Sequence, residues 1–355
     1  MSALRDAAKA AASPVFGIPL SVLDVAPVSG DSTPAQALAE ATALAPLVDR
    51  LGYHRLWYAE HHNMPSIASS APDVLIANAG ALTQHIRLGS GGVMLPNHAP
   101  MVVAERFGTL EALHPGRIDL GIGRAPGTDQ RTMLALRRQG SSDDLIELLN
   151  ELYGFFNGFA PGDAYAGIRA VPGYGGMPAI WLLGSSGYSA QVAGLMGLPF
   201  AFAHHFSAAN TLPALDLYRS RFRESPDLEA PYAQIAVFVV CADTDAEAEL
   251  WASAMALVFA QRRTGRPPSP LPTLADIEAH HWSDEERAYA DAYLRTQVVG
   301  SPETVRTKLD QLLAETRADE VMATATIPDA EARSRSFTLL AELAGLPVAP
   351  MTGTQ

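Results

Sequence analysis

The stretch LWYAEHHNMP places three titratable side chains in a row directly after an apolar run. These side chains are Glu60, His61 and His62, and histidine doublets recur at 204–205 and 280–281. Imidazole exchanges protons near neutral pH and binds transition metals. The stretch is therefore compatible with a metal site, with an acid–base site or with a chance sequence.

A metal site is the least favoured of these interpretations. Neither H-x-H nor H-E-x-x-H occurs, and the single cysteine, Cys241, lies in an apolar run typical of a buried hydrophobic side chain. Adjacent residues of a strand point to opposite sides, so His61 and His62 cannot both face one pocket while the strand continues. We therefore expect no metal ion and one pocket-facing histidine per doublet. The same reasoning makes either His204 or His205 a pocket-lining residue.

Two glycine-rich segments can bring the backbone close to a flat or charged ligand. GSGG at 89–92 ends an apolar run, and it fits either a tight turn or a close backbone approach. In GIGRAPG the third glycine stands one place too late for a dinucleotide-binding fingerprint. Arg124 in this segment can bind a phosphate through paired hydrogen bonds, or it can pair with a neighbouring carboxylate.

A third segment, GSSGY at 184–188, opens an expected helix with small residues and hydroxyl groups. A helix N-terminus with serine hydroxyls is a ready anion site, although a serine there can also simply cap the helix. Arg124 follows a neighbouring strand, and this adjacency favours a phosphate site.

Eight β-type runs, each followed by a helical pattern, must position these segments. The runs are nearly continuous in apolar residues, which is typical of parallel strands with both faces buried. This pattern predicts an α/β fold, a (β/α)₈ TIM barrel, with its site at the carboxyl ends of the strands. The runs cover 16–25, 54–60, 86–92, 117–125, 178–185, 198–205, 234–243 and 319–326.

Two insertions, at about 157–178 and 262–300, interrupt the alternation of strands and helices. The first is rich in Gly, Pro and Tyr, and the second is Pro-rich and then acidic. Both are expected to be irregular. His280 and His281 fall in the second insertion, where a solvated loop without a chemical role is the favoured interpretation.

Composition and charge narrow the class of protein. The 355 residues are 48% hydrophobic and carry a net charge of −13, which argues against a surface for nucleic acids or anionic membranes. No apolar run approaches the ~20 residues of a membrane span, and the N-terminus lacks the apolar core of a signal peptide. We expect a cytoplasmic protein with a flexible lead-in at 1–14, one domain at 15–345 and a tail at 346–355.

Several longer segments carry a family resemblance when they are taken in order. They are RLWYAEHHN, IRLGSGGVMLPNHAPMVVAERFGTLEALHPGRIDLGIGRAPG, AIWLLGSSGYSAQVA, LPFAFAHHF and VVGSPETV. Over about residues 16–344 the chain resembles the bacterial luciferase family of flavin-dependent monooxygenases. The resemblance implies a (β/α)₈ barrel that binds reduced FMN, or in one branch a deazaflavin coenzyme, at the carboxyl ends of its strands.

The resemblance also implies where a flavin binds. Gly91 and Gly92 match a pair that forms a non-proline cis peptide under the isoalloxazine, where luciferase has two alanines. Arg124 matches the arginine that binds the flavin phosphate. A second phosphate-binding arginine has no clear counterpart, and Arg137 or Arg138 can substitute for it. The phosphate-binding loop is matched by Gly184, Ser185, Ser186 and Tyr188. Luciferase has a glutamate at the first of these four positions.

The catalytic histidine of the family is matched by His61, with Glu60 and His62 as its neighbours. The reaction of reduced flavin with O₂ requires that water be kept away and that the reacting oxygen receive a hydrogen bond. A histidine at the mouth can donate this hydrogen bond or move a proton near neutral pH. The 262–300 insertion is the candidate for a mobile lid that excludes water.

The expected function is that of a flavin-dependent monooxygenase acting on a small organic substrate with O₂. Because no convincing nicotinamide site is present, we expect reduced FMN from a separate NAD(P)H:flavin reductase. A homodimer is expected because dimers are common in the family. The open alternatives are a deazaflavin-dependent dehydrogenase, a flavin-binding protein without turnover and a metal-dependent barrel hydrolase. An apolar wall from 157–178 fits an aldehyde, an aromatic or a sulfur compound alike.

Overall fold

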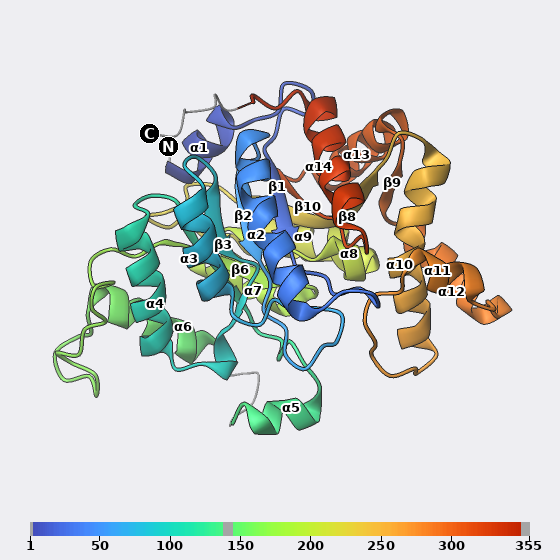
Figure 1. Ribbon diagram of the computed structural model, residues 1–355. Helices are drawn as coiled ribbons and strands as arrows, with labels where there is room; N and C mark the ends of the chain where they lie inside the picture. The colour runs from blue at the N-terminus through green and yellow to red at the C-terminus, as the bar shows by residue number, and fades with distance from the viewer. Residues whose placement is uncertain (1–2, 138–144, 349–355) are drawn as a thin grey trace.

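A closed parallel barrel forms the centre of the molecule (Figure 1). The computed structural model describes residues 3–137 and 145–348. Neighbouring strands of the barrel are parallel, and the pairing of β10 with both β8 and β1 closes the ring. This confirms the predicted (β/α)₈ TIM barrel. In order around the ring the strands are β1 (Leu20–Asp24), β2 (Arg55–Tyr58), β3 (Arg87–Ser90), β5 (Ile118–Gly123), β6 (Ala179–Gly184), β7 (Phe200–Phe202), β8 (Ala233–Cys241) and β10 (Glu320–Thr324).

The third strand of the barrel wall is interrupted, which the continuous run expected at 86–92 did not predict. β3 stops before the Gly91–Gly92 peptide, and β4 (Val93–Met94) continues the wall beyond it by pairing with the end of β5. A further short strand, β9 (Val298–Gly300), pairs with the end of β8 outside the ring.

Helices cover the outside of the barrel, and their ends follow the local sequence signals. Thr33 and Gln36 form a capping box at the start of the first of them, with Pro34 at its first position. Gly197 and Gly345 end two others in the left-handed conformation, with φ of 66° and 64°. No helix among the described residues is long and apolar enough to cross a membrane. The covering helices are α2 (Pro34–Arg50), α3 (Pro72–Leu82), α4 (Pro100–Leu113), α6 (Leu145–Asn157), α7 (Gly187–Met196), α9 (Thr211–Arg221), α13 (Pro302–Thr316) and α14 (Ala330–Ala344).

Alternate residues of the strands fill two apolar layers. On β2, Leu56 and Tyr58 belong to the cluster shared with the helices, whereas Trp57 belongs to a second cluster inside the barrel. Trp57 packs edge-on against Trp181 of β6, with ring centroids 5.2 Å apart. The barrel interior is therefore a packed core, and a ligand must bind at one end of it.

The amino-terminal ends of the strands carry a buried ion network of Arg55, Asp119 and Glu320, which we call the barrel floor. Arg55 Nη1 lies 2.6 Å from Asp119 Oδ2, and its Nε lies 3.0 Å from Glu320 Oε1. All three side chains are fully buried. Contact between opposite charges offsets the large cost of removing them from water.

The start of the chain is helical, where a flexible lead-in was expected over 1–14. α1 (Ala3–Ala10) buries Ala8 in the same cluster as Trp57, at the floor end of the barrel. Beyond this helix, the Ser13 hydroxyl donates a hydrogen bond of 2.5 Å to the carbonyl oxygen of Ala344. The segment from Ala8 to Ser13 is therefore packed onto the barrel rather than extended from it.

The 262–300 insertion contains two helices, so the prediction that it is irregular was wrong. α10 (Asp245–Arg263) leads into it, and α11 (Leu274–Ala279) and α12 (Asp284–Leu294) follow before β9. Phe259 of α10 stacks on Tyr293 of α12 with centroids 4.6 Å apart. These elements form the right-hand side of the molecule in Figure 1.

Capping explains why these helices form in an acidic, Pro-rich segment. Thr273 and Ser283 each begin a capping box, with Asp276 and Glu286 as the reciprocal partners. The acidic residues thus accept backbone hydrogen bonds at helix N-termini, where negative charge is stabilised. Composition indicated a loop, whereas the spacing of hydroxyl and acidic residues three positions apart indicated helix starts.

Beyond Asn157, the last residue of α6, the 157–178 insertion has no helix or strand, as expected, and it packs on the outer helices. Phe159 and Tyr165 lie 5.0 and 5.6 Å from the ring of Phe155 on α6, centroid to centroid. A Cβ on Gly108 of α4 would lie 2.1 Å from Cα of Gly173, and one on Gly173 would lie 2.7 Å from the carbonyl oxygen of Ala104. Its aromatic residues therefore take part in packing against α6.

Candidate functional site

The carboxyl ends of the strands bring most of the predicted residues to one end of the barrel, which we call the mouth. β2 ends two residues before Glu60, so the Glu-His-His stretch lies in irregular backbone. The backbone amides of His61 and His62 donate to the carbonyl oxygens of Ser69 and Gly127, at 3.0 and 3.1 Å. Two neighbouring loops therefore fix the stretch from both sides.

Glu60 is a buried junction of hydrogen bonds. Its Oε1 lies 2.8 Å from Nε2 of His62 and 2.9 Å from Nε2 of His98. Its Oε2 accepts a hydrogen bond of 2.9 Å from the backbone amide of Met94. Burial by itself would raise the pKa of Glu60, but the hydrogen bonds from His98, His62 and Met94 outweigh it and hold the pKa below its usual range. At neutral pH Glu60 is therefore a carboxylate that accepts three hydrogen bonds.

No motif in the sequence singles out His98. It follows the short 3₁₀ helix η1 (Leu95–Asn97) and lies 38 positions after Glu60 in the chain. The two side chains meet because the segment that leads into α4 lies against Glu60, to which the Met94 amide also bonds. A histidine just before a proline-started helix was a weak signal that could have suggested it.

His61 has a different environment from its neighbours on either side. Its Nδ1 is buried and makes no hydrogen bond among the described residues. Burial lowers the pKa of His61 to about 4, although the Glu60 carboxylate opposes the shift. The ring is therefore neutral at pH 7 and able to accept a proton. Glu60 and His62 bond to each other, so the two histidines of the doublet have different partners. The alternation of a strand does not account for this, because β2 ends before the doublet.

The second doublet starts a helical turn, α8 (His204–Ser207), rather than ending a strand as predicted, because β7 stops two residues earlier. Both ring nitrogens of His204 are engaged, with Thr211 Oγ1 at 2.8 Å and the Thr296 carbonyl oxygen at 2.9 Å. His204 therefore ties α8 to the segment before β9.

His205 is the member of this doublet that lies near His61. Its Nδ1 lies 3.1 Å from the carbonyl oxygen of Ala236, so Nδ1 donates and Nε2 of the neutral ring is left as an acceptor. Burial lowers the pKa of His205 to about 4, and repulsion from His204 and His61 adds to the shift. The mouth thus contains two neutral imidazoles.

The peptide between Gly91 and Gly92 is cis. A Cβ on Gly91 would lie 2.6 Å from Cδ1 of Leu23, and one on Gly92 would lie 2.7 Å from the carbonyl oxygen of Gly121. An alanine at Gly91 would need a shift of the Leu23 side chain, whereas one at Gly92 would meet the backbone of the neighbouring strand. Glycine at both positions lets the wall strands approach each other closely and presents a peptide without side chains.

Arg124 follows β5 and lies flat on Tyr188, with its guanidinium carbon 4.3 Å from the ring centroid. Tyr188 belongs to the first turn of α7, so the cation is held beside that helix N-terminus. Ser186 is the N-cap of α7, and its side chain makes no capping hydrogen bond. The amides and hydroxyl at this end, together with Arg124, form a donor set that fits a phosphate group.

The remaining two residues of the expected phosphate loop are held by packing. A Cβ on Gly184 would lie 2.8 Å from Cβ of Ser189. The carbonyl oxygen of Ser185 accepts a hydrogen bond of 2.8 Å from the Ser207 hydroxyl, which fixes the loop against α8. The loop is therefore attached to α8 and packed against the first turns of α7.

The loop after Arg124 contains a polar cluster that the sequence did not indicate. Asn63 Nδ2 donates to Asp129 Oδ2 at 3.1 Å and to Thr132 Oγ1 at 3.0 Å. This links the end of the Glu-His-His stretch to the short helix α5 (Gln130–Ala135). Arg137 follows α5 with a φ of 53°, and Arg138 lies outside the described residues.

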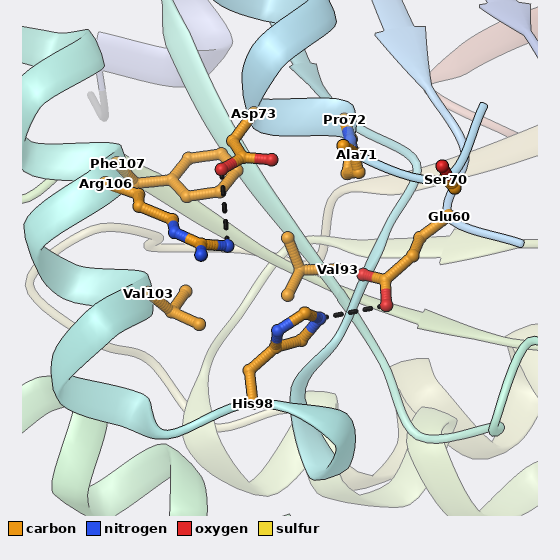
Figure 2. A pocket seen from close by; sticks show the side chains of 10 residues that line it. All are labelled: Glu60, Ser70, Ala71, Pro72, Asp73, Val93, His98, Val103, Arg106 and Phe107. Carbon is orange, nitrogen blue, oxygen red and sulfur yellow. Dashed lines mark hydrogen bonds and ion pairs between the residues drawn. The ribbon is translucent and has the colours of Figure 1, made fainter. Parts of the chain in front are cut away.

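A small cavity lies beside the mouth, on the far side of Glu60 from the barrel axis (Figure 2). Glu60 and His98 form one wall, and α3 and α4 form the other. Arg106 crosses the opening to Asp73, with Nη1 3.3 Å from Oδ2. The apolar lining comes from Ala71, Pro72, Val93, Val103 and Phe107. Within residues 3–137 and 145–348, no group of three or more His, Cys, Asp or Glu side chains is arranged to hold a metal ion.

Comparison with known proteins identifies relatives over nearly the whole chain. A family described as luciferase-like monooxygenase matches residues 18–320. A luciferase-like monooxygenase of Escherichia coli (strain K12) is 46% identical over 327 residues, 91% of this chain and 96% of that protein. The N-acetyl-S-alkylcysteine monooxygenase of Bacillus subtilis (strain 168) is 43% identical over 190 residues, 53% of this chain and 57% of that protein.

Solved structures share the same fold. Apo-MsnO8 is 38% identical, with a TM-score of 0.82 over 93% of this chain and 99% of its own. The FMN complex of the oxygenating constituent of 3,6-diketocamphane monooxygenase from Pseudomonas putida is 18% identical, with a TM-score of 0.68, covering 94% and 99%. An F420-dependent secondary alcohol dehydrogenase is 12% identical, with a TM-score of 0.66, covering 92% and 98%. The last two similarities concern the fold alone.

Proposed function

Because this chain belongs to the luciferase-like monooxygenase family, we propose that it is a flavin-dependent monooxygenase that oxidises a small organic substrate with O₂ and reduced FMN. One observation carries the proposal. At a single barrel mouth, an Arg124–Tyr188 stack stands at the start of α7 and a glycine-only peptide, Gly91–Gly92, stands in the wall. The first suits a phosphate, and the second suits a flat ring.

The chain's own residues then have distinct roles. Arg124 and the first amides of α7 bind the phosphate, with Gly184, Ser185, Ser186 and Tyr188 as the surrounding loop. Gly91 and Gly92 contact the ring system. A bound reduced flavin would supply the electrons and the site at which O₂ reacts.

His61 is the proposed catalytic residue. Its lowered pKa leaves the ring neutral, so it can take a proton from a reacting group or hydrogen-bond to it without carrying a charge. Glu60 and His62 are proposed to act through position, since they bond to each other. His205 is proposed to line the pocket with its free acceptor nitrogen.

The 262–300 insertion is the proposed lid that keeps water out. Leu271 is bound to the loop after β1 at two points: its amide donates to the Val28 carbonyl oxygen at 2.8 Å, and its carbonyl oxygen accepts from the Gly30 amide at 2.9 Å. This loop follows a strand end at the mouth. The insertion is therefore attached where exclusion of water matters to the chemistry.

The electrons are proposed to come from a separate NAD(P)H:flavin reductase in the cytoplasm. The segment GIGRAPG lacks the glycine spacing of a dinucleotide site. Oxygen uptake by the purified chain should therefore require added reductase, and NADH alone should not support it. Uptake with NADH and FMN but without a reductase would contradict this source of electrons.

The decisive experiment is an anaerobic titration with FMN, riboflavin and coenzyme F420, followed by exposure of the reduced complex to O₂. The proposal predicts tight FMN, weaker riboflavin and substrate-dependent oxygen incorporation. Preference for F420 with hydride transfer and no O₂ consumption would favour a deazaflavin-dependent dehydrogenase. FMN binding without product from any substrate would favour a flavin-binding protein without turnover. The substrate panel should include N-acetyl-S-alkylcysteines, since a relative is named for them, beside aldehydes and aromatics.

We also propose a homodimer. Val74 and Leu82 of α3, and Val102 and Leu113 of α4, are large apolar side chains exposed to solvent. The two helices lie side by side on one face of the barrel (Figure 1). Light scattering of the purified chain should give twice the monomer mass, and a stable monomer at micromolar concentration would contradict the dimer.

A further inference from the structure

The backbone on both sides of the Gly91–Gly92 peptide is held by the end of β2. Before the peptide, the Gly91 amide donates to the carbonyl oxygen of Tyr58 at 2.8 Å, which is a sheet bond. After it, the Met94 amide donates to a side chain, Oε2 of Glu60, at 2.9 Å. The second half of this wall strand is thus held on one side by its pairing with β5 and on the other by the Glu60 carboxylate.

The direction of that carboxylate depends in turn on the donors at its other oxygen. His62 comes from the same stretch as Glu60, so it moves with it. His98 lies two residues before α4 and four residues after Met94, and it bonds to Oε1 at 2.9 Å. It therefore gives Glu60 a second bond to the segment that contains Met94 and fixes the direction of the carboxylate.

We propose that His98 is a positioning residue: it fixes the Glu60 carboxylate on the Met94 amide and so sets the place of the Gly91–Gly92 peptide in the barrel wall. It need not touch a ligand to do this. Its side chain opens on the other side into the cavity of Figure 2, beside Val103 and Phe107 of α4.

The charges around Glu60 support a specific role for His98. On the same stretch, His61 and His62 face it, and His62 bonds to it. Across the cavity, the charges of Asp73 and Arg106 pair with each other at 3.3 Å. When the His98 donor is removed, fewer hydrogen bonds counteract the rise in the pKa of Glu60 that burial causes.

The sign of the resulting pH dependence follows from linkage. Glu60 has a folded pKa below its usual value, so it contributes stability that is present above the unfolded pKa and lost as pH falls through the folded one. Without His98 the folded pKa rises. The stability that the Glu60 carboxylate contributes must then begin to be lost at a higher pH as the solution is acidified.

The test uses His98→Ala, His98→Gln and a matched control, His85→Ala. His85 also stands beside a carboxylate, 3.8 Å from Asp49 Oδ1, but its side chain is 55% exposed. Melting temperature and FMN dissociation constant are measured for each full-length protein between pH 3.5 and 8. The melting measurements need no ligand, whereas the FMN measurements rest on the proposed function.

For His98→Ala we expect the acid-side fall in melting temperature to move up by about one pH unit, with FMN binding at pH 4.5 weakened about tenfold. At pH 8 the FMN constant should stay close to that of the wild type. His98→Gln keeps an N–H donor and should recover part of both shifts. Added imidazole should restore His98→Ala, since the vacated space adjoins an existing cavity. His85→Ala should behave as the wild type does.

Unchanged pH profiles in His98→Ala would overturn the proposal, as would equal losses in the Ala and Gln variants. A uniform drop in stability at every pH, without rescue by imidazole, would assign His98 to packing alone and also overturn it. If the wild type binds no FMN, the proposed function fails, while the melting profiles still decide the role of His98. If the alanine variant does not fold, the glutamine variant carries the same comparison.

Discussion

The barrel floor and the Glu60 junction both bury a carboxylate at an end of the barrel, but they give it different partners. At the floor, burial alone would raise the pKa of Asp119, yet Arg55 and Arg87 hold it at about 2. At the mouth, Glu60 faces the imidazoles of His62 and His98. Guanidinium groups stay charged at any pH the protein meets, whereas imidazoles change charge near neutrality.

This difference separates stability from chemistry within one fold. The floor has a permanent charge pattern that closes the barrel and has no access to solvent. The mouth has groups whose protonation can change, and they lie near the Gly91–Gly92 peptide of the barrel wall, which carries no side chains. Substitutions at the two ends should therefore have different signatures: loss of folding at the floor, and loss of binding or turnover at the mouth.

The largest expected effect is at the floor. Arg55→Met leaves Glu320 without its Arg55 partner and Asp119 with Arg87 alone, and we expect it to lower the free energy of unfolding by about 3–5 kcal/mol. Urea denaturation measures the change. Arg335→Met, which breaks the exposed pair with Asp243, is the control and should cause no measurable change. Similar stabilities for the two variants would remove the distinction between floor and surface.

The next largest effect is on turnover. His61→Ala should lower the rate of oxygenation by about 10²–10⁴-fold, as expected for loss of a group that moves a proton. FMN affinity should remain within about threefold, because His61 is not part of the phosphate donor set. Rapid-reaction kinetics with reduced FMN and O₂ measures this. Turnover at the wild-type rate would exclude a catalytic role for His61.

The same variant tests the pH dependence of the mouth. Since the folded pKa of His61 is about 4 and its ordinary value is 6.5, the unfolded chain binds more protons between these values. Stability contributed by the neutral ring is therefore lost as pH falls from 6.5 towards 4. His61→Ala should lose less stability over this window, measured by thermal melting. A steeper loss in the variant would contradict the lowered pKa.

A smaller effect is expected on cofactor affinity. Arg124→Ala should weaken FMN by about 10–100-fold, the range of hydrogen bonds to a charged group, and should leave riboflavin nearly unchanged. Fluorescence titration with both compounds measures the difference. Arg169→Ala removes a similar stack, on Tyr174 at 4.7 Å, from the outer face and serves as the control. Equal losses for FMN and riboflavin would argue against a phosphate at Arg124.

The smallest effect concerns the proposed lid. Thr273→Ala removes the N-cap of α11, and such a cap contributes about 1 kcal/mol to local helix stability. Amide exchange should speed up within 262–300 and stay unchanged at the barrel floor. Faster exchange throughout the barrel would mean that the insertion and the barrel unfold as one unit.

The barrel itself could be predicted from the sequence because its signals are local. Continuous apolar runs mark strands buried on both faces, and residues such as Thr33 and Pro34 mark a helix start within four positions. These inferences need no knowledge of which segments meet in space.

The Glu60 junction could not be predicted in this way, because it depends on distance in the chain. His98 meets Glu60 only after β2 and α4 pack together, and no period in the sequence links the two positions. The same limit applies to Asn63 and Asp129. In contrast, the helices of 262–300 had local signals, Thr273 with Asp276 and Ser283 with Glu286, which composition obscured.

The stack of Arg124 on Tyr188 has a consequence for the thermodynamics of binding. An arginine free to rotate in solvent loses up to about 2 kcal/mol of rotamer entropy when a ligand immobilises it. Here the guanidinium already lies 4.3 Å from the ring centroid, so most of that entropy is lost when the chain folds. A phosphate that binds at the mouth therefore costs little further rotamer entropy of Arg124, and more of the contact enthalpy contributes to affinity.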